Sequence, residues 1–404
     1  MLRFELMKIF KNKLNMAAML LGYLLIAVCI VCYIADQSIY NSAEDVYETG
    51  AAAVTYDRKL AQAQTEYVTE EFVTTFLAEL QASPLDLDSD DAYMEIVRKN
   101  SSMFYFIGNS YAELNQQYPL FNDMKSIDLS DGAQFYQRRI NKIKNYLNMD
   151  FSFGNYTAAE KEYWLAKAAQ VKEPLAWGSK RTMSMVYDLL SVGFYLLAVV
   201  VVCISPVLSR ESESGASQLL FTAKYGKTRL IRVKILASLL FSVGYISIGL
   251  LGGTLVIGLL FGFSEAGLPV QLWNIAIPYD FSIGQMCMVE FLVILAISVA
   301  VTMLILLISA CTKSTMATMA AILVLLIGPA FLETSKTYGW YNHLIDLAAI
   351  RFVDTKTVLG IFVDYRFGNI IVDYLTMGLF TYILLAIAAG ILVRRVFVDR
   401  IMKG

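Results

Sequence analysis

The sequence predicts an all-α polytopic membrane protein with six transmembrane helices and a helical extracellular domain inserted between the first and second helices. Three observations support this class. Of the 404 residues, 57% are hydrophobic, and the mean hydropathy is +0.54. The apolar residues gather into runs close to or above the roughly 20 residues that a helix needs to cross a bilayer. These runs lack the polar and apolar alternation of a membrane β-strand, so they are expected to be helices.

Six apolar runs are expected to span the membrane, and the fifth is the shortest. They cover residues 14–34, 184–207, 235–263, 284–310, 316–332 and 372–393. The first is longer than the apolar core of a signal peptide and no small-x-small cleavage site follows it, so we interpret it as a retained anchor. Residues 1–34 are thus a cytosolic segment with the first span, and residues 182–404 hold the other five spans.

Basic residues near the ends of the runs predict the orientation. Lys and Arg gather in the first thirteen residues, in 210–234 and in 394–403, whereas the connection 264–283 has neither. Because basic loops stay on the cytosolic side, both termini are expected in the cytoplasm, in a multi-pass protein of a bacterial cell (plasma) membrane. The segment 333–371 carries four basic residues, which weakens the pattern there. We expect it to form interfacial helices outside.

The polar and aromatic stretch 35–181 has the size of one domain and is expected to be extracellular. A long helix is expected over 42–82, ended by Pro84, with further helices in 90–118, 131–147 and 157–171. This pattern predicts a small helical bundle. The stretch contains no cysteine, so it has no disulfide framework.

A short polar segment between the second and third runs carries helix signals at both ends. Residues 209–224 read SRESESGASQLLFTAK. Ser209 is a good N-cap, glutamates follow in the first turn, where the helix dipole favours anions, and Gly226 is a stop. A short amphipathic helix held between two spans can transmit force to a cytoplasmic partner. The residues expected to make that contact are Glu211, Glu213, Gly215, Leu219, Leu220 and Phe221.

This connection resembles the one after the second span in membrane subunits of ABC type-2 exporters. There it typically reads Glu-x-Glu-x-Gly-Thr, then Leu-Leu, then Ser or Thr near a Pro, and a basic run ending in Lys. This chain departs with Ala216 for the threonine and Lys224 where the proline is common. The branch of the family with a large ectodomain between the first two spans fits best. The matching residues are Glu211, Glu213, Gly215, Leu219, Leu220, Thr222 and Lys234.

The resemblance implies a permease subunit of an ATP-driven exporter that moves an amphipathic peptide, lipid or hydrophobic drug. Residues 209–224 would be the coupling helix that docks on a separate ATP-binding cassette subunit, which would hold ATP and Mg. A second permease subunit, identical or homologous, and membrane lipid would be the other partners. A juxtamembrane helix lying on anionic lipid is the alternative interpretation of this segment.

The residues themselves argue against an enzyme. Phe221 stands where the first glycine of a phosphate-binding loop ending at Gly226 would have to be, so no nucleotide site is expected on this chain. His343 is the single histidine, so no His-based metal or nucleophile cluster can form. We therefore expect no cofactor, no metal and no nucleic acid on this chain.

Two weaker site candidates lie within the runs. Glu290 is an acid in the outer third of the fourth run, and a carboxylate within the membrane is a functional candidate, although it could also snorkel to the outer interface. Gly249/Gly253 and Gly258/Gly262 are G-x-x-x-G pairs in the third run. They permit close helix contact, either in a dimer or within one subunit.

Two other classes of function remain open. A membrane-anchored sensor or scaffold would use the extracellular domain to bind a ligand, although six spans are more than an anchor needs. An ion-coupled secondary transporter would need charges within the membrane, and Glu290 is the obvious one.

Overall fold

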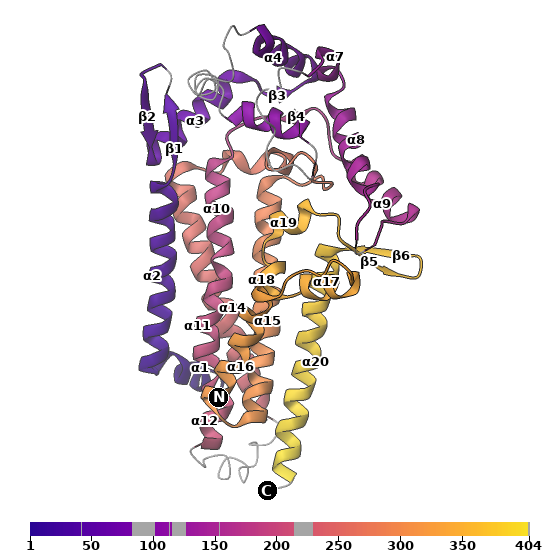
Figure 1. Ribbon diagram of the computed structural model, residues 1–404. Helices are drawn as coiled ribbons and strands as arrows, with labels where there is room; N and C mark the ends of the chain where they lie inside the picture. Colours follow the sequence, from indigo (N-terminus) through magenta and orange to yellow (C-terminus); the bar gives the residue numbers. More distant parts are fainter. Residues whose placement is uncertain are drawn as a thin grey trace.

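Five long apolar helices run side by side through the described part of the chain, and each is long enough to cross a membrane (Figure 1). A computed structural model describes residues 1–41, 43–82, 102–112, 114, 127–152, 154–213 and 229–402. Within these residues the chain is mostly helical, and it is a multi-pass membrane protein, as the sequence predicts. The spans are α2 (Lys13–Ala35), Arg181–Arg210, α14 (Arg229–Phe261), α15 (Ile283–Thr312) and Tyr374–Phe397 within α20 (Tyr374–Met402).

The second span is built from three consecutive helices and continues beyond its apolar part. They are α10 (Arg181–Ser191), α11 (Gly193–Ile204) and α12 (Pro206–Glu213). Ser205, between α11 and α12, keeps helical backbone angles, and proline is tolerated at the first position of a helix. The second span therefore continues as a helix to Glu213, beyond its apolar part.

The fifth predicted span, over 316–332, is a shorter helix than the other five. The chain reverses after α15 at Lys313, whose φ of 58° is left-handed, and Ser314 caps α16 (Thr315–Ile327) by accepting from the Ala317 N–H. A 3₁₀ turn, η3 (Gly328–Phe331), extends it. At rises of about 1.5 and 2 Å per residue the two together cover roughly 27 Å, slightly less than a hydrocarbon core of about 30 Å.

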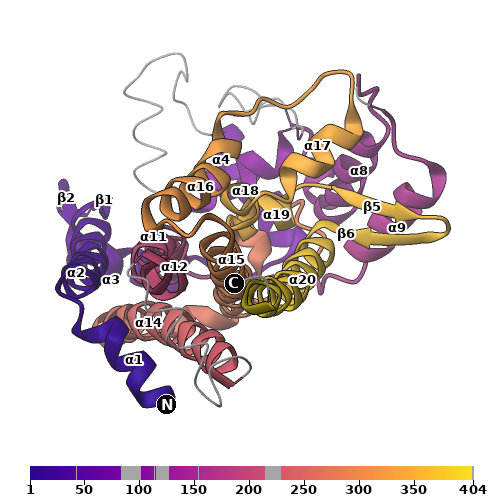
Figure 2. The same ribbon diagram turned by 90° about the horizontal axis from the view of Figure 1, so that it is seen from below.

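The two ends of the helix bundle differ in what they carry (Figure 1). At one end, called here the terminal end, both chain termini lie, α12 ends and α14 begins. The short helix α1 (Leu2–Lys11) lies across this end beneath α14 (Figure 2). At the other end, called the cap end, the described residues of the range 36–180 form a folded cap region over the spans (Figure 1).

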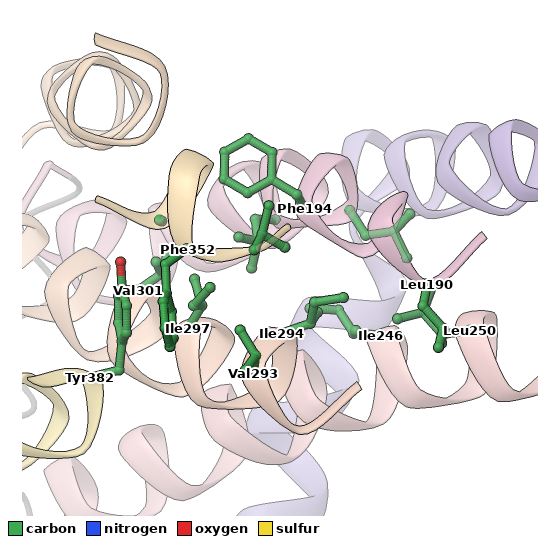
Figure 3. Close-up of a cluster of buried hydrophobic side chains, with 14 of the residues drawn as sticks. Leu190, Phe194, Ile246, Leu250, Val293, Ile294, Ile297, Val301, Phe352 and Tyr382 are labelled. Carbon is green, nitrogen blue, oxygen red and sulfur yellow. The ribbon is translucent and has the colours of Figure 1, made fainter. Parts of the chain in front are cut away.

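The helix α15 forms the centre of the bundle. It contacts α10, α11, α12, α14, α16 and α20, whereas α2 packs at the edge against α10, α11 and α14 (Figure 2). Leu190 and Phe194 of the second span meet Ile246 of α14 and Ile294 of α15 in a buried cluster (Figure 3). Apolar side chains also cover the outside of the bundle, as expected of a surface that faces lipid. Examples are Leu20, Leu24, Val31, Leu251, Leu259, Val324 and Ile387.

The predicted long helix over 42–82 is wrong, because two strands precede its helical part. β1 (Ser38–Asn41) and β2 (Val46–Thr49) form an antiparallel hairpin that pairs Tyr40 with Tyr47. The hairpin turn contains Asp45 with a φ of 57°, and aromatic and β-branched residues favour the flanking strands. The helical pattern is then divided at β3 (Tyr67–Val68) into α3 (Gly50–Gln64) and α4 (Glu70–Ala82).

The rest of the cap region is helical. α8 (Phe135–Leu147) and α9 (Ala158–Ala168) lie close to their predicted positions, and α9 begins with a capping box between Thr157 and Glu160. A four-residue helix, α7 (Leu129–Gly132), precedes them, and β4 (Leu175–Ala176) pairs with β3. The helix expected in 90–118 falls largely outside the described residues.

Two connections complete the cap end. The connection between α14 and α15 contains two 3₁₀ turns, η1 (Ser264–Gly267) and η2 (Val270–Leu272). The predicted interfacial segment 333–371 contains short helices followed by a β-hairpin that the sequence did not predict. These elements are α17 (Gly339–Asp346), α18 (Ala349–Phe352), α19 (Thr355–Gly360), β5 (Asp364–Phe367) and β6 (Ile370–Asp373).

Candidate functional site

The predicted coupling segment does not begin at Ser209. The Ser209 hydroxyl lies inside α12 and donates to the Ser205 carbonyl at 2.9 Å, so Ser209 is not an N-cap. A serine within a helix can return its hydroxyl to the carbonyl four residues earlier, and here this keeps the second span helical through its polar end. Glu211 and Glu213 lie in the last turn of this helix.

The remaining members of the predicted contact surface, Gly215, Leu219, Leu220 and Phe221, lie outside the described residues. What the structure does describe is how the start of this connection is attached to the bundle. The Ser209 N–H donates to the Ser309 hydroxyl at 3.0 Å, and the Ser209 and Thr315 hydroxyls lie 2.7 Å apart. The Ser309 hydroxyl in turn donates to the Ser205 carbonyl at 2.8 Å. The helix that leads into the connection is therefore bonded to α15 and α16.

A buried ion pair joins α1 to the same place. Lys234 of α14, whose side chain is 1% exposed, donates to Glu5 at 3.0 Å and to the Val207 carbonyl at 3.1 Å. Lys8 donates to the other carboxylate oxygen of Glu5 at 2.7 Å. Burial alone would raise the pKa of Glu5, but Lys234 and Lys8 outweigh burial and hold this pKa below its ordinary value. One carboxylate thus connects α1, α14 and the start of α12.

The sequence analysis missed this pair, although a signal was present. Glu5 stands four residues before Ile9, and both lie on the buried face of α1. An acid on the apolar face of a helix, in a segment that is otherwise basic, is expected to have a cationic partner. The partner could not be chosen, because Lys234 lies 229 positions away.

Glu290 is fully buried, so the alternative that it snorkels to the interface is wrong. One carboxylate oxygen accepts from the Ser191 hydroxyl of α10 at 3.3 Å. The other accepts from the N–H and the hydroxyl of Thr355, at 3.2 and 2.7 Å. Glu290 therefore holds the first residue of α19 against two spans.

A second set of contacts lies beside Glu290. The Tyr187 hydroxyl donates to Asp354 at 2.7 Å and accepts from the Lys356 N–H at 2.9 Å. The Lys356 ammonium lies 4.3 Å from the ring centre of Tyr187 and 4.5 Å from that of Trp273. These groups satisfy one another, so the arrangement is suited to joining α10, α19 and the connection after α14 rather than to exchanging a ligand.

Buried polar contacts between residues far apart in the sequence join the cap region to the transmembrane helices. Arg139 of α8 donates to the carbonyls of Ile275, Ala168 and Ile277 at 2.8, 3.1 and 3.2 Å. Two of these carbonyls belong to the connection between α14 and α15. Burial lowers the pKa of Arg139, and Glu173 opposes this shift.

Further contacts of the cap region reach the hairpin β5–β6 and the start of α10. The Trp164 indole donates to Asp364 at 2.8 Å, and Lys167 pairs with Asp373 at 3.1 Å. Glu265, which is buried in the connection after α14, accepts from Thr182 at 3.0 Å and from Arg58 at 3.2 Å. These ties involve every connection of the cap end.

The two glycine pairs of α14 have different surroundings. A Cβ at Gly249 would lie 2.7 Å from Ile26, and one at Gly253 would lie 2.7 Å from Leu189 and 3.2 Å from Ile26, so this pair faces α2 and α10 of the same chain. A Cβ at Gly258 would meet the ring of Phe263, and Gly262 has a φ of +79° just after α14 ends. The second pair therefore shapes the end of the helix.

The described residues contain no group of three or more His, Cys, Asp or Glu side chains placed to hold a metal ion. No family model matches the chain, and neither a curated protein nor a solved structure is significantly similar to it. The fold by itself defines the class, a mostly helical multi-pass membrane protein with a folded region over one end of its spans.

Proposed function

We propose that this chain is the permease subunit of an ATP-driven exporter in a bacterial cell membrane. It would work with a second permease subunit and with separate ATP-binding cassette subunits, and it would move an amphipathic peptide, lipid or hydrophobic drug. One observation carries the proposal: the second span continues as α12 directly into the connection that holds Glu211 and Glu213, at the end where both termini lie (Figure 1). A partner docked on residues 209–213, the described start of this segment, would act directly on the helix that continues the second span.

The attachments of α12 would distribute such a force. Ser209 is bonded to Ser309 of α15 and to Thr315 of α16, and Lys234 of α14 is bonded to the carbonyl of Val207. Interhelical hydrogen bonds of this kind stabilise helix contacts in membranes by about 0.5 to 2 kcal/mol each. Movement of α12 would therefore be passed to three neighbouring helices.

The topology that goes with this function has six spans. Five crossings would leave the termini on opposite sides of the membrane, whereas both termini lie at the terminal end (Figure 1). Counting α16 with η3 as the fifth of six crossings accounts for this placement. Exposed basic residues at the terminal end, such as Lys11, Arg210 and Arg394, favour the cytosol for that end, with the cap region outside.

The proposal is tested by purifying the tagged chain from its own membranes in mild detergent. We expect ATPase activity to co-purify with the wild-type chain, and Glu211→Ala combined with Leu219→Ala to remove most of it. Arg394→Ala, a charge loss at the same end but on α20, is the matched control and should retain the activity. Absence of ATPase activity from the wild-type sample, or equal activity in the double variant, would contradict the assignment of residues 209–224.

One observation favours the sensor as a second candidate. A cavity of about 460 Å³ lies between the cap region and the connection after α14. Tyr105, Lys142, Lys180 and Trp273 are among its lining residues, which combine aromatic and cationic groups. If no ATP-binding partner is captured, a ligand seated there would be the function to test, because the buried ties described above connect this region to the spans.

A further inference from the structure

A second cavity lies at the terminal end, where α1, the start of α2, α12 and α14 meet. Its volume is about 590 Å³. Five cationic side chains line it and a single acid, Glu5, accompanies them. The cations are Lys8, Lys11, Lys13, Arg210 and Lys234.

The charges that line the cavity are not balanced within the described part of the chain. Glu5 is already paired with Lys8 and Lys234. Lys11, Lys13 and Arg210 form no ion pair with the residues that the structure describes. An anion is the ligand that this environment favours.

The remaining walls of the cavity are mostly apolar, with the amides of Asn12 and Asn15 among them. Ile9, Pro206, Val207 and Ala237 line it between the charged groups. An electrostatic contact in such a site is stronger than one on an open surface, because less water screens it. Lys234 is buried, so part of the positive charge is built into the protein interior.

The position of the cavity indicates which anion it receives. Phe4 and Phe10 of α1 and Leu14 of α2 are exposed beside the charged residues, and α2 continues from there as an apolar span. Large apolar side chains next to a ring of cations are typical of the boundary between lipid headgroups and acyl chains. A lipid phosphate at this depth could enter the cavity while its acyl chains follow Leu14 and the apolar face of α2.

We propose that this cavity is a binding site for the headgroup of one anionic phospholipid, of the phosphatidylglycerol class, taken from the leaflet at the terminal end. Lys11, Lys13 and Arg210 contact the phosphate, and the pair of Lys234 with Glu5 forms the inner wall. The bound lipid joins α1 to α12, the helix that leads into the connection at 214–228. This site does not depend on the proposed function, since it requires no ATP-binding partner.

The test uses the full-length chain, delipidated in detergent and titrated with phosphatidylglycerol or with phosphatidylcholine of the same acyl chains. Native mass spectrometry counts the bound lipids. We expect one phosphatidylglycerol to bind at least about 10-fold more tightly than phosphatidylcholine. Lys11→Gln, Lys13→Gln and Arg210→Gln together should weaken it by about 100-fold or slightly more, since each basic residue near a lipid phosphate contributes about 1 kcal/mol.

The matched control removes three charges from the same end of the molecule but outside the cavity. It combines Lys313→Gln, Arg394→Gln and Arg395→Gln, and should change phosphatidylglycerol binding less than about twofold. Equal loss of binding in both triple variants would show that the general charge of this end attracts the lipid, and would overturn the site. Equal binding of the two lipids by the wild-type chain would also overturn it.

Two further arms cover a free anion and a variant that fails to fold. Displacement of the lipid by millimolar inorganic phosphate or glycerol phosphate would assign the cavity to a soluble anion instead. In the wild-type chain, phosphatidylglycerol should protect Lys11 and Lys13 from acetylation by at least about threefold, with Lys313 unprotected, as measured by peptide mass spectrometry. Equal protection of all three lysines would contradict the proposal without any variant.

Discussion

The cap end and the terminal end of this protein are held together by different kinds of contact. At the cap end, buried charged groups such as Arg139, Glu265 and Glu290 bond to backbone and side chains of several elements. At the terminal end, the buried pair of Glu5 with Lys234 lines a cavity of about 590 Å³, and a few hydroxyl contacts join α12 to α15 and α16. The difference favours rearrangement at the terminal end over separation of the cap region from the spans.

This contrast has an energetic basis. A hydrogen bond to a charged group contributes about 1.5 to 3 kcal/mol, and leaving a buried partner unsatisfied costs a similar amount. Several such bonds would have to break together to separate the cap region from the spans. A cavity offers less resistance, because its lining side chains lack close neighbours on one side. A motor acting on α12 would therefore change the terminal end first.

The largest effect is expected from Arg139→Met. Three buried carbonyls would lose their donor, so the free energy of unfolding should fall by about 4 kcal/mol, measured as a lower Tm of the purified protein. Arg138→Met is the neighbouring control. Arg138 pairs with Asp131 at 2.9 Å with both side chains 38% exposed, so its loss should cost less than about 1 kcal/mol. Equal Tm values for the two variants would show that the cap region is not held through Arg139.

At the terminal end, Glu5→Leu should have the next largest effect. It removes the carboxylate that pairs with the buried ammonium of Lys234 at 3.0 Å, and should cost about 3 kcal/mol. Lys234→Met should cost less, because Lys8 still pairs with Glu5. The double variant should be more stable than the sum of the single changes predicts, since it removes both charges. Additive losses in the Tm would mean that the two residues do not interact.

The spans were predictable because a segment that crosses lipid must be a long, mostly apolar helix. The predicted run 284–310 agrees with α15 (Ile283–Thr312) to within two residues at each end, and 14–34 agrees with α2 within one. The fifth run was harder, because α16 with η3 is near the minimum length for a crossing. Apolar length is a local property, so a single segment reveals it.

The polar contacts at the cap end were not predictable, because they depend on residues that are far apart in the sequence. Arg139 and Ile275 are 136 positions apart, and Trp164 and Asp364 are 200 apart, so no spacing in the sequence relates them. Ser209 shows a related difficulty, because serine can cap a helix or bond back to a carbonyl within one. Its hydrogen bond to Ser205 was decided by packing against α15, which no local pattern contains.

A smaller effect is expected where α14 packs against the edge helix α2. Gly253→Leu would place side-chain atoms against Leu189 and Ile26, and should lower the free energy of unfolding by about 2 kcal/mol. Gly252→Leu is the matched control, because a Cβ at Gly252 meets nothing within 4 Å and the residue is exposed on the same helix. Loss of Tm in the Gly252 variant alone would show that α14 presents its other face to the bundle.

The smallest expected effect is a difference in how pH changes the stability of the two ends. Burial raises the pKa of Asp364 to about 6, although the Trp164 indole N–H, which stabilises the carboxylate, opposes this shift. The folded protein thus binds this proton more tightly than the unfolded chain does, and the contribution to stability increases as the pH falls from about 6 to about 4. The pKa of Glu5 is lowered instead, so its contribution is complete above about pH 4.5 and is lost below that value.

Asp364→Asn keeps an acceptor for the Trp164 indole but removes the charge. It should raise the stability by about 1 kcal/mol at pH 7.5, after allowing for partial screening by solvent, and by nothing at pH 4. Trp164→Phe should move the pH at which the stability changes to a higher value, because it removes the N–H that stabilises the Asp364 carboxylate. Both are measured as Tm against pH. If the stability gain is the same at pH 4 and pH 7.5, the surroundings of Asp364 do not raise its pKa. Protonation of Asp364 would then not stabilise the cap end at acid pH.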